Sequence, residues 1–199
     1  MNMKILVTYA TMSGSTAEVA RAVADRLRQN GTAVDLRPIS EVGKISSYDA
    51  AVLGAPMILD WHRDMVSFIV KNQEALKELP VAYFTTQLHL TKLSEAEVSG
   101  VSVFLDPKLA KAPISPDKMD ISEKFGTPAN CIGSTLKKAP LVKPVSIGFF
   151  GGELDYNKLK LLPKLFVKFI IRGVEGDFRN WNAIHEWVEG IRPKLQKAQ

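Results

Sequence analysis

Short, continuous runs of apolar residues alternate along the chain with longer segments whose apolar residues recur every three or four positions. Five of the short runs are rich in β-branched and aromatic side chains and have the length of strands. They cover residues 4–9, 33–36, 50–54, 81–85 and 145–150. Most of them lack alternating polar positions, as expected when helices cover both faces of a parallel sheet. The pattern therefore predicts five buried, mainly parallel strands.

Helical periodicity separates these strands. Val19, Val23 and Leu27 share one face of a segment that we expect to begin near Ser15 and to end at Gly31. Two further apolar stripes predict a helix before the fourth strand and another near the C-terminus; they consist of Met65, Phe68, Ile69 and Leu76, and of Ile184, Trp187, Val188 and Ile191. Residues 40–48 support only a short turn or helix. We expect an α/β fold with a doubly wound, five-stranded parallel sheet in the order 2-1-3-4-5.

The segment between the fourth and fifth strands is too long for a single connecting helix. Residues 95–110 predict a helix that Pro107 interrupts, and prolines and glycines predict loop for the remainder. We expect a single domain over residues 1–199 that carries an extended insertion at 90–143, added between strands 4 and 5. A lid over a cofactor, an oligomer contact and a plain surface excursion are all open as the role of this insertion.

The composition is that of an ordinary folded domain, with 46% hydrophobic and 24% charged residues in a chain of 199. Cys131 is the sole cysteine, which excludes an internal disulfide and a thiolate-bound metal cluster and favours a reducing compartment. The first strand follows the N-terminus so closely that we expect no secretory leader. No apolar run approaches the ~20 residues of a membrane span. We therefore expect a cytoplasmic protein.

The formal charge of +5 and the pI of about 9.3 favour anionic partners. A basic stripe recurs every four residues in a segment at 159–172 with helical periodicity, at Lys160, Lys164, Lys168 and Arg172. Two interpretations are open: contact with the anionic inner face of a membrane, or a crossover helix with its lysines in water. We expect no nucleic-acid partner, and a homo-oligomer is left open.

The strongest chemical signal lies between the first strand and the first helix, in the run Thr11, Met12, Ser13, Gly14, Ser15 and Thr16. Its hydroxyls, with backbone N–H groups around Gly14 and the positive end of the helix dipole, suit a phosphate group. The run lacks the lysine of a Walker loop and the glycine spacing of a dinucleotide fingerprint. An ordinary Ser/Thr capping turn is the alternative.

The pattern Thr11-x-Ser13-Gly14-x-Thr16 resembles the phosphate loop of flavodoxins. The blocks after the fifth strand, at 151–156, 164–171 and 176–187, are similar to the flavodoxin-domain branch that includes menaquinone-dependent protoporphyrinogen oxidase. The resemblance implies a flavodoxin-like fold and an FMN cofactor whose phosphate is wrapped by residues 11–16. It also implies a flavin ring at the carboxyl ends of the strands.

Three segments follow strands where such a ring is expected. The predicted cofactor contacts there are Pro56, Met57, Ile58, Leu59, Asp60 and Trp61, then Thr85, Thr86, Gln87 and Leu88, and finally Gly152. Trp61 has two open interpretations, stacking on the flavin or covering the core. No catalytic residue is identified; His62 and His89 are weak candidates because they lie in these segments. The histidines have no metal-ligand spacing, and we expect no metal.

Function is predicted as FMN-dependent oxidoreduction, in which electrons or hydride pass from a small organic donor to a quinone. The resemblance makes protoporphyrinogen oxidation in heme biosynthesis its most specific form. The first alternative is a flavodoxin-type electron carrier between proteins, against which the basic pI counts. The second is a signalling domain without flavin on the same fold. Such a domain needs acidic residues after the first and third strands, and this chain does not have them there.

Overall fold

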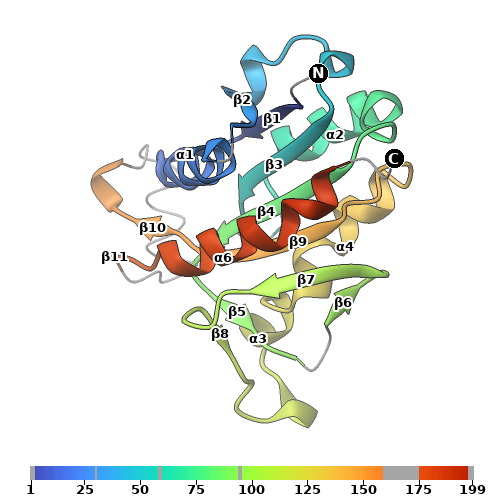
Figure 1. Cartoon of the computed structure of the whole chain (residues 1–199). Helices are drawn as coiled ribbons and strands as arrows, with labels where there is room; N and C mark the ends of the chain where they lie inside the picture. The colour runs from blue at the N-terminus through green and yellow to red at the C-terminus, as the bar shows by residue number, and fades with distance from the viewer. Residues whose placement is uncertain (1–2, 30, 58–59, 94–95, 159–174, 197–199) are drawn as a thin grey trace.

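The computed structural model describes residues 3–29, 31–57, 60–93, 96–158 and 175–196 (Figure 1). The five predicted strands are all present, and their ends lie within two residues of the predicted positions. They are β1 (Lys4–Tyr9), β2 (Ala33–Pro38), β3 (Ala50–Pro56), β4 (Val81–Gln87) and β9 (Ser146–Gly151). They are parallel and lie in the order β2-β1-β3-β4-β9. The predicted α/β fold with a doubly wound parallel sheet is confirmed.

The sheet is wider than predicted. In the described part of the chain it has seven strands, because β7 (Val101–Leu105) pairs in parallel with β9 and β6 (Glu97–Val98) pairs antiparallel with β7. Both added strands come from the insertion. The predicted count of five is therefore corrected, while the relative order of the five predicted strands holds.

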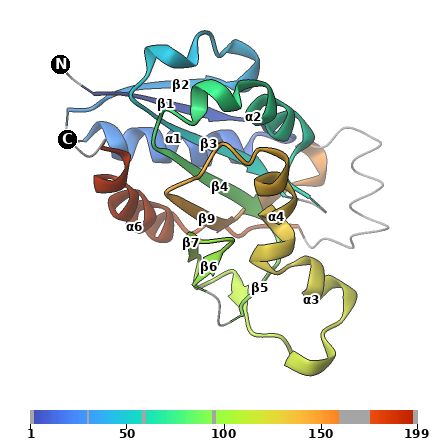
Figure 2. The same cartoon turned by 90° about the vertical axis from the view of Figure 1, so that its right-hand side faces the viewer.

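Helices cover both faces of the sheet, as Figure 2 shows from the side. α1 (Ser15–Arg28) and α6 (Trp181–Ile191) pack on one face, and α2 (Arg63–Leu76) and α4 (Pro128–Lys138) on the other. Successive strand residues point to opposite faces, so Leu6 packs beneath α2 and α4 while Ile5 and Val7 pack beneath α1 and α6. Both cores are buried, which explains the unbroken apolar runs.

The helix predicted at 95–110 is wrong, because this segment contains the β6–β7 hairpin. Ser99 and Gly100 connect the two strands with φ values of 51° and 76°. Two consecutive residues with positive φ are typical of the tight turn that suits the twist of a hairpin. Val98, Val101 and Val103 flank it and have the β-branched side chains of strands. The turn chemistry outweighed the weak helical spacing.

The loop predicted for the rest of the insertion is also corrected, since it contains α3 (Ile121–Phe125) and the longer α4. Pro128 is the first residue of α4, where its missing N–H costs nothing. Thr127 is the N-cap residue, and its Oγ1 accepts a hydrogen bond from Asn130 N at 3.4 Å. α4 is thus the crossover helix that leads from β4 to β9.

The remaining elements are short, and they also include the turn at 40–48, where two 3-10 turns confirm that prediction. They are η1 (Ile39–Glu41), η2 (Ile45–Ser47), β5 (Leu90–Thr91), β8 (Ala110–Lys111), η3 (Pro116–Lys118), β10 (Glu153–Leu154), η4 (Tyr156–Lys158), β11 (Gly176–Asp177) and η6 (Pro193–Leu195). The basic segment predicted at 159–172 lies outside the described residues. Within them, no helix has the length and hydropathy that a membrane span requires.

Candidate functional site

The turn after β1 leaves the N-terminus of α1 open at the carboxyl edge of the sheet. Gly14 is the N-cap residue, and its φ of 98° lies in the region that favours glycine. Its N–H donates to Oγ1 of Thr11 at 3.0 Å, and its carbonyl accepts from Glu18 N at 3.2 Å. A Cβ built at Gly14 meets nothing within 4 Å. The N–H groups of the first helical turn therefore have neither an intrahelical partner nor a capping side chain there.

Thr16, predicted to bind phosphate through its hydroxyl, has a different contact. Its side chain is buried, and its Oγ1 lies 2.7 Å from Oγ1 of Thr86 at the end of β4. One hydroxyl donates and the other accepts, and such a buried bond stabilises the fold by about 1 kcal/mol. The pair joins residues 70 positions apart and fixes the start of α1 against β4. Met12 and Ser13, by contrast, are exposed and half-buried at the surface of the loop.

The end of β4 is held by its own side chains. Thr85 donates from Oγ1 to Oε1 of Gln87 at 3.1 Å, and Gln87 donates from Nε2 to the carbonyl of His89 at 2.9 Å. Thr85, Thr86 and Gln87 are buried, while Leu88 is half-buried. These side chains were predicted to face a flavin, yet in the structure they hold the turn. Of these four residues, Leu88 is the one that is not buried.

Trp61 covers the core, which is the second of its two interpretations. Its side chain is 1% exposed, its Nε1 donates to the carbonyl of Ala55 at 3.1 Å, and its ring centroid lies 5.1 Å from that of Tyr83. A flavin cannot stack on a ring whose faces are already packed. Of the two open interpretations of Trp61, the packing therefore favours the core residue.

The other residues after β3 reach the surface. Pro56 and Met57 are half-buried, and Met57 N donates to the carbonyl of Thr86 at 2.9 Å. Asp60 is exposed, and its Oδ1 accepts from the N–H of Trp61 at 2.8 Å. Ile58 and Leu59 lie outside the described residues. Because Met57 bonds to the end of β4, the ends of β3 and β4 lie side by side.

Both candidate histidines lie at this edge of the sheet, and each has a structural contact. His62 is the N-cap residue of α2, where its Nδ1 accepts from Asp64 N at 3.4 Å and lies 3.9 Å from the Asp64 carboxylate. His89 is exposed, and its Nε2 lies 3.1 Å from Oγ1 of Thr91. A Cβ at Gly126 would come within 2.6 Å of the His89 ring. His89 therefore packs on the insertion, while His62 faces a groove.

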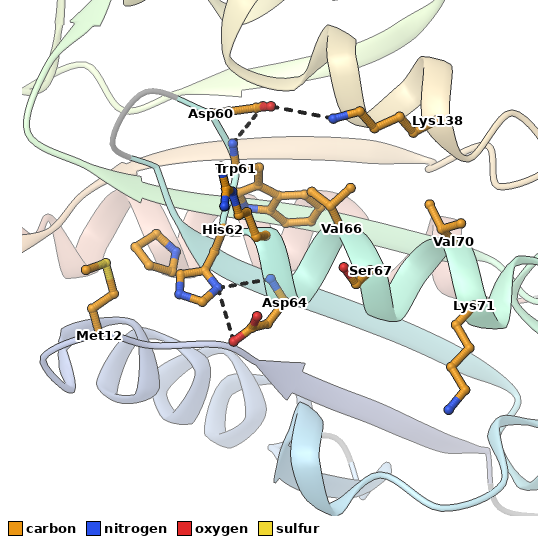
Figure 3. Close-up of a pocket in the computed structure, with 12 residues that line it drawn as sticks. Met12, Asp60, Trp61, His62, Asp64, Val66, Ser67, Val70, Lys71 and Lys138 are labelled. Atoms are coloured by element: carbon orange, nitrogen blue, oxygen red, sulfur yellow. Dashed lines mark hydrogen bonds and ion pairs between the residues drawn. The ribbon is translucent and has the colours of Figure 1, made fainter.

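This groove has a volume of about 1140 Å³ and runs from the phosphate loop along α2 (Figure 3). It includes five residues predicted as site candidates, and seven more that the sequence interpretation missed. The predicted ones are Met12, Pro56, Asp60, Trp61 and His62, and the missed ones are Arg63, Asp64, Val66, Ser67, Val70, Lys71 and Lys138. The spacing of Arg63, Ser67, Val70 and Lys71 places them along one face of a helix, a signal that was available in the sequence.

The groove carries both signs of charge. Lys138 reaches from α4 toward Asp60, with Nζ 3.9 Å from its carboxylate, and Arg63 and Lys71 come from α2. Figure 3 shows Lys138 and Asp60 at one side of the groove and Met12 at the other. A ligand that lies between them would meet cations on two helices and an apolar floor of Val66 and Val70.

Gly152 lies where predicted, beside the end of β4. Its N–H donates to the carbonyl of Gln87 at 2.9 Å, and its carbonyl accepts from Phe178 N at 2.9 Å. The preceding Gly151 has no room for a side chain, because a Cβ would lie 1.9 Å from the carbonyl oxygen of Phe178. The two glycines thus allow the segment before α6 to pack closely against the strand ends.

Burial raises the pKa of the Cys131 thiol to about 12, so this thiol is protonated at neutral pH and is a poor nucleophile. Among the residues that the structure describes, no group of histidine, cysteine and carboxylate side chains is placed to hold a metal ion. The donors that the site offers are therefore the N–H groups of the loop and the polar side chains of the groove.

Comparisons with known proteins give a family and several relatives of this chain. A family model described as a flavodoxin domain matches residues 6–180. Protoporphyrinogen IX dehydrogenase (quinone) of Escherichia coli strain K12 is 27% identical over 89 residues, which is 43% of this chain and 49% of that protein. The same match is found for the protein of Escherichia coli O157:H7. The chain spans about half the length of the curated relatives it matches.

Solved structures with similar folds share little sequence with this chain. A short-chain flavodoxin associated with a bacterial microcompartment has a TM-score of 0.51 at 13% identity, over 98% of this chain and 99% of that one. A flavoprotein from Thermotoga maritima has a TM-score of 0.50 at 14% identity, over 98% of this chain and 37% of that one. At this identity the likeness shows the fold alone.

Proposed function

The chain belongs to the flavodoxin domain family, whose cofactor is FMN, and from this premise we propose that it is an FMN-dependent oxidoreductase. It passes electrons or hydride from an organic donor to a quinone. Its specific reaction is the oxidation of protoporphyrinogen, a step of heme biosynthesis. The flavin-type redox class follows from the family, while the donor and the quinone are our proposal.

One observation carries the proposal: an uncapped helix N-terminus opens next to a large groove. The first turn of α1 presents N–H groups and the positive end of the helix dipole, as a phosphate group requires. Met12 belongs both to this turn and to the wall of the groove. A phosphorylated ligand held by the turn can therefore extend into the groove.

The residues present fit FMN. The open space above Gly14 and the main-chain N–H groups of Ser15 and Thr16 suit its phosphate, and the half-buried Pro56 and Met57 offer apolar contacts for its ring. When bound, FMN supplies the exchange of hydride or electrons, chemistry for which no protein nucleophile is needed. The chain itself binds and orients the cofactor and shapes the space for the donor.

The groove along α2 suits a donor with carboxylate groups. Lys71 and Arg63 on α2 and Lys138 on α4 are cations that lie around an apolar floor. Protoporphyrinogen is an apolar macrocycle with two propionate groups, so its chemistry matches this lining. The name of the E. coli relative states this activity with a quinone, which supports the same reaction here. The match covers about half of that relative's length.

A turnover assay tests the proposal. Protein loaded with FMN is mixed with protoporphyrinogen IX and a soluble menaquinone analogue, with and without vesicles of anionic lipid, and protoporphyrin fluorescence is followed against free FMN. We expect a rate at least about tenfold above that of free FMN. A protein that holds FMN but shows no such rate in either condition contradicts the proposed reaction and favours an electron carrier.

Two variants test the groove. Lys71→Gln with Lys138→Gln should raise the KM for the porphyrinogen, by about threefold to tenfold, without changing FMN affinity, because each lost ion pair to a propionate weakens binding by about 0.2–1 kcal/mol. Lys77→Gln is the matched control, since Lys77 is the C-cap residue of α2 but pairs with Glu74 and does not line the groove. If the double variant and the control variant changed this KM equally, Lys71 and Lys138 would not bind the propionate groups and the groove would not be the donor site.

A further inference from the structure

Arg179 lies at a junction of three elements and is almost buried, with 8% of its side chain exposed. Its Nε and Nη2 donate to the two carboxylate oxygens of Asp177 at 2.7 Å each, in a forked arrangement. Its Nη1 donates to Oε2 of Glu18 at 2.6 Å. Because Asp177 lies in β11 and Glu18 in α1, one side chain joins the β10–β11 pair to the helix that begins at the phosphate loop.

Two further contacts fix the position of this guanidinium group. Nη2 lies 3.7 Å from the carboxylate of Glu153, which is paired with Asp177 across β10 and β11. Cζ lies 5.0 Å from the ring centroid of Trp181, the first residue of α6. The hydrogen bond to Asp177, followed by that to Glu18, raises the pKa of Arg179, so the group is charged at every working pH. A lysine cannot reproduce this planar fork.

Glu18 is the reason that this junction matters for the site. It belongs to the first turn of α1, and side chains of a helix tilt toward its N-terminus. A carboxylate there stabilises the helix dipole but opposes any anion that binds at the same N-terminus. Glu18 is 54% exposed, so solvent screens its charge only in part, and the contact with Arg179 offsets it directly.

We propose that Arg179 is a positioning residue for the phosphate group of the cofactor: it holds Glu18, fixes the first turn of α1 and cancels a negative charge that otherwise opposes the phosphate. All three nitrogens of its side chain already have protein acceptors, so this role needs no direct contact with the phosphate. The inference rests on the proposed function, in which residues 11–16 hold that phosphate.

The test compares two ligands that differ only in the phosphate. The dissociation constants of FMN and riboflavin are measured by flavin fluorescence quenching for the apoprotein and for Arg179→Gln, Glu18→Gln and the double variant. We expect Arg179→Gln to weaken FMN by about fivefold to tenfold and riboflavin by less than twofold, since only FMN meets the exposed charge of Glu18. Glu18→Gln should leave FMN binding within about twofold, and the double variant should regain affinity to within about threefold of the wild type.

Matched controls separate this role from a structural one. Arg26→Gln removes another arginine that ties α1 to the C-terminal part of the chain, through Glu189 at 2.6 Å, but at the far end of the helix. It should lower the unfolding midpoint without changing either affinity. If Arg179→Gln does not fold, Arg179→Lys keeps the charge and serves instead, with an expected loss of FMN affinity below threefold and no loss for riboflavin.

Each outcome has one meaning. Equal losses for FMN and riboflavin, or no recovery in the double variant, overturn the positioning role and leave Arg179 a structural residue. A wild-type protein that binds riboflavin as tightly as FMN shows instead that the phosphate site itself is wrongly assigned. In that case the proposed function fails before the inference about Arg179 is reached.

Discussion

The N-termini of α1 and α4 lie at the same edge of the sheet but are closed to different extents. In α4, Thr127 accepts a hydrogen bond from Asn130 N, and Pro128 removes one of the unpaired N–H groups. The neighbouring carbonyl of Gly126 accepts from Thr91 N at 2.9 Å, which joins this helix start to β5, the short strand that follows β4. In α1, the N-cap residue is Gly14, which has no side chain to cap the turn.

Unequal capping of this kind can determine which helix terminus of a fold binds the ligand. A parallel sheet with crossover helices directs several helix dipoles to the same edge, and each is a potential anion site. In α4 a capping side chain and a proline reduce the number of unpaired N–H groups, whereas in α1 no side chain caps these groups. Substitutions at the open terminus should therefore affect ligand binding, and substitutions at the closed terminus should affect stability.

Closing the open terminus should have the largest effect. Gly14→Asp disfavours the φ of 98° by about 1–2 kcal/mol, so the free turn leaves the conformation that receives the phosphate and binding must restore it; the added carboxylate opposes the phosphate by up to about 1 kcal/mol more. FMN affinity, measured by fluorescence titration, should fall on the order of 100-fold. Gly14→Ala is the control for backbone strain alone and should lose less, roughly tenfold. An aspartate variant that binds FMN normally would contradict an open phosphate site.

Removing the loop hydroxyls should have a smaller effect. Thr11→Ala with Ser13→Ala deletes the acceptor that holds Gly14 N, together with one hydroxyl that is left for the phosphate. Loss of two hydrogen bonds of about 1 kcal/mol each predicts an FMN affinity that is roughly tenfold to 30-fold lower. Isothermal titration calorimetry measures this change. An unchanged dissociation constant would mean that neither hydroxyl supports the cofactor.

Opening the closed terminus should affect stability and not ligand binding. Thr127→Ala removes the cap of α4 and should lower the free energy of unfolding in urea by about 1 kcal/mol. FMN affinity should change by less than twofold, because Pro128 has no N–H group and this terminus therefore still has fewer free donors than α1. If the variant lost FMN binding as severely as Gly14→Asp, the two helix termini would not have the separate roles described here.

A substitution far from both helix termini should have the smallest effect, and its effect on the Tm should depend on pH. Burial raises the pKa of Asp35, but hydrogen bonds from Tyr48 and Arg37 outweigh it, so the folded-state pKa lies below the ordinary value of about 3.9. The resulting stability is present above that ordinary value and is lost as the pH falls through the folded pKa. Asp35→Asn should therefore lower the Tm near pH 7 by a few degrees or less, and this difference should shrink below about pH 4.

FMN affinity at pH 7 should be the same for Asp35→Asn and for the wild type, because Asp35 lies in β2 away from the groove. A Tm difference that stayed constant down to pH 3 would show that the carboxylate of Asp35 does not contribute through its charge.

The open terminus could be predicted from the sequence because its signal is local. Thr11, Ser13 and Gly14 act within one turn, and the five strands are continuous apolar runs, so neighbouring residues suffice to identify both. The insertion departs from its prediction although Ser99-Gly100 and Thr127-Pro128 carry local turn and capping signals, because a weak helical spacing and the many prolines conceal them.

The directions of individual side chains could not be read from the sequence. Thr16 faces Thr86 and Gln87 faces His89 because of contacts between elements that meet only after folding. Trp61 fits a ring-stacking residue and a core residue equally well in sequence, and only the packing against Tyr83 decides between them. The partners of Arg179 lie as far as 161 residues away.

Amide NMR shows whether the N-terminus of α1 holds the phosphate of FMN. The ¹⁵N-labelled apoprotein is titrated with FMN and, separately, with inorganic phosphate. We expect the amide signals of Ser13 to Ala17 to shift in both titrations, and those of Cys131 and Ile132 in α4 not to shift with phosphate. Saturation with FMN that leaves the signals of residues 13–17 unmoved would contradict this expectation.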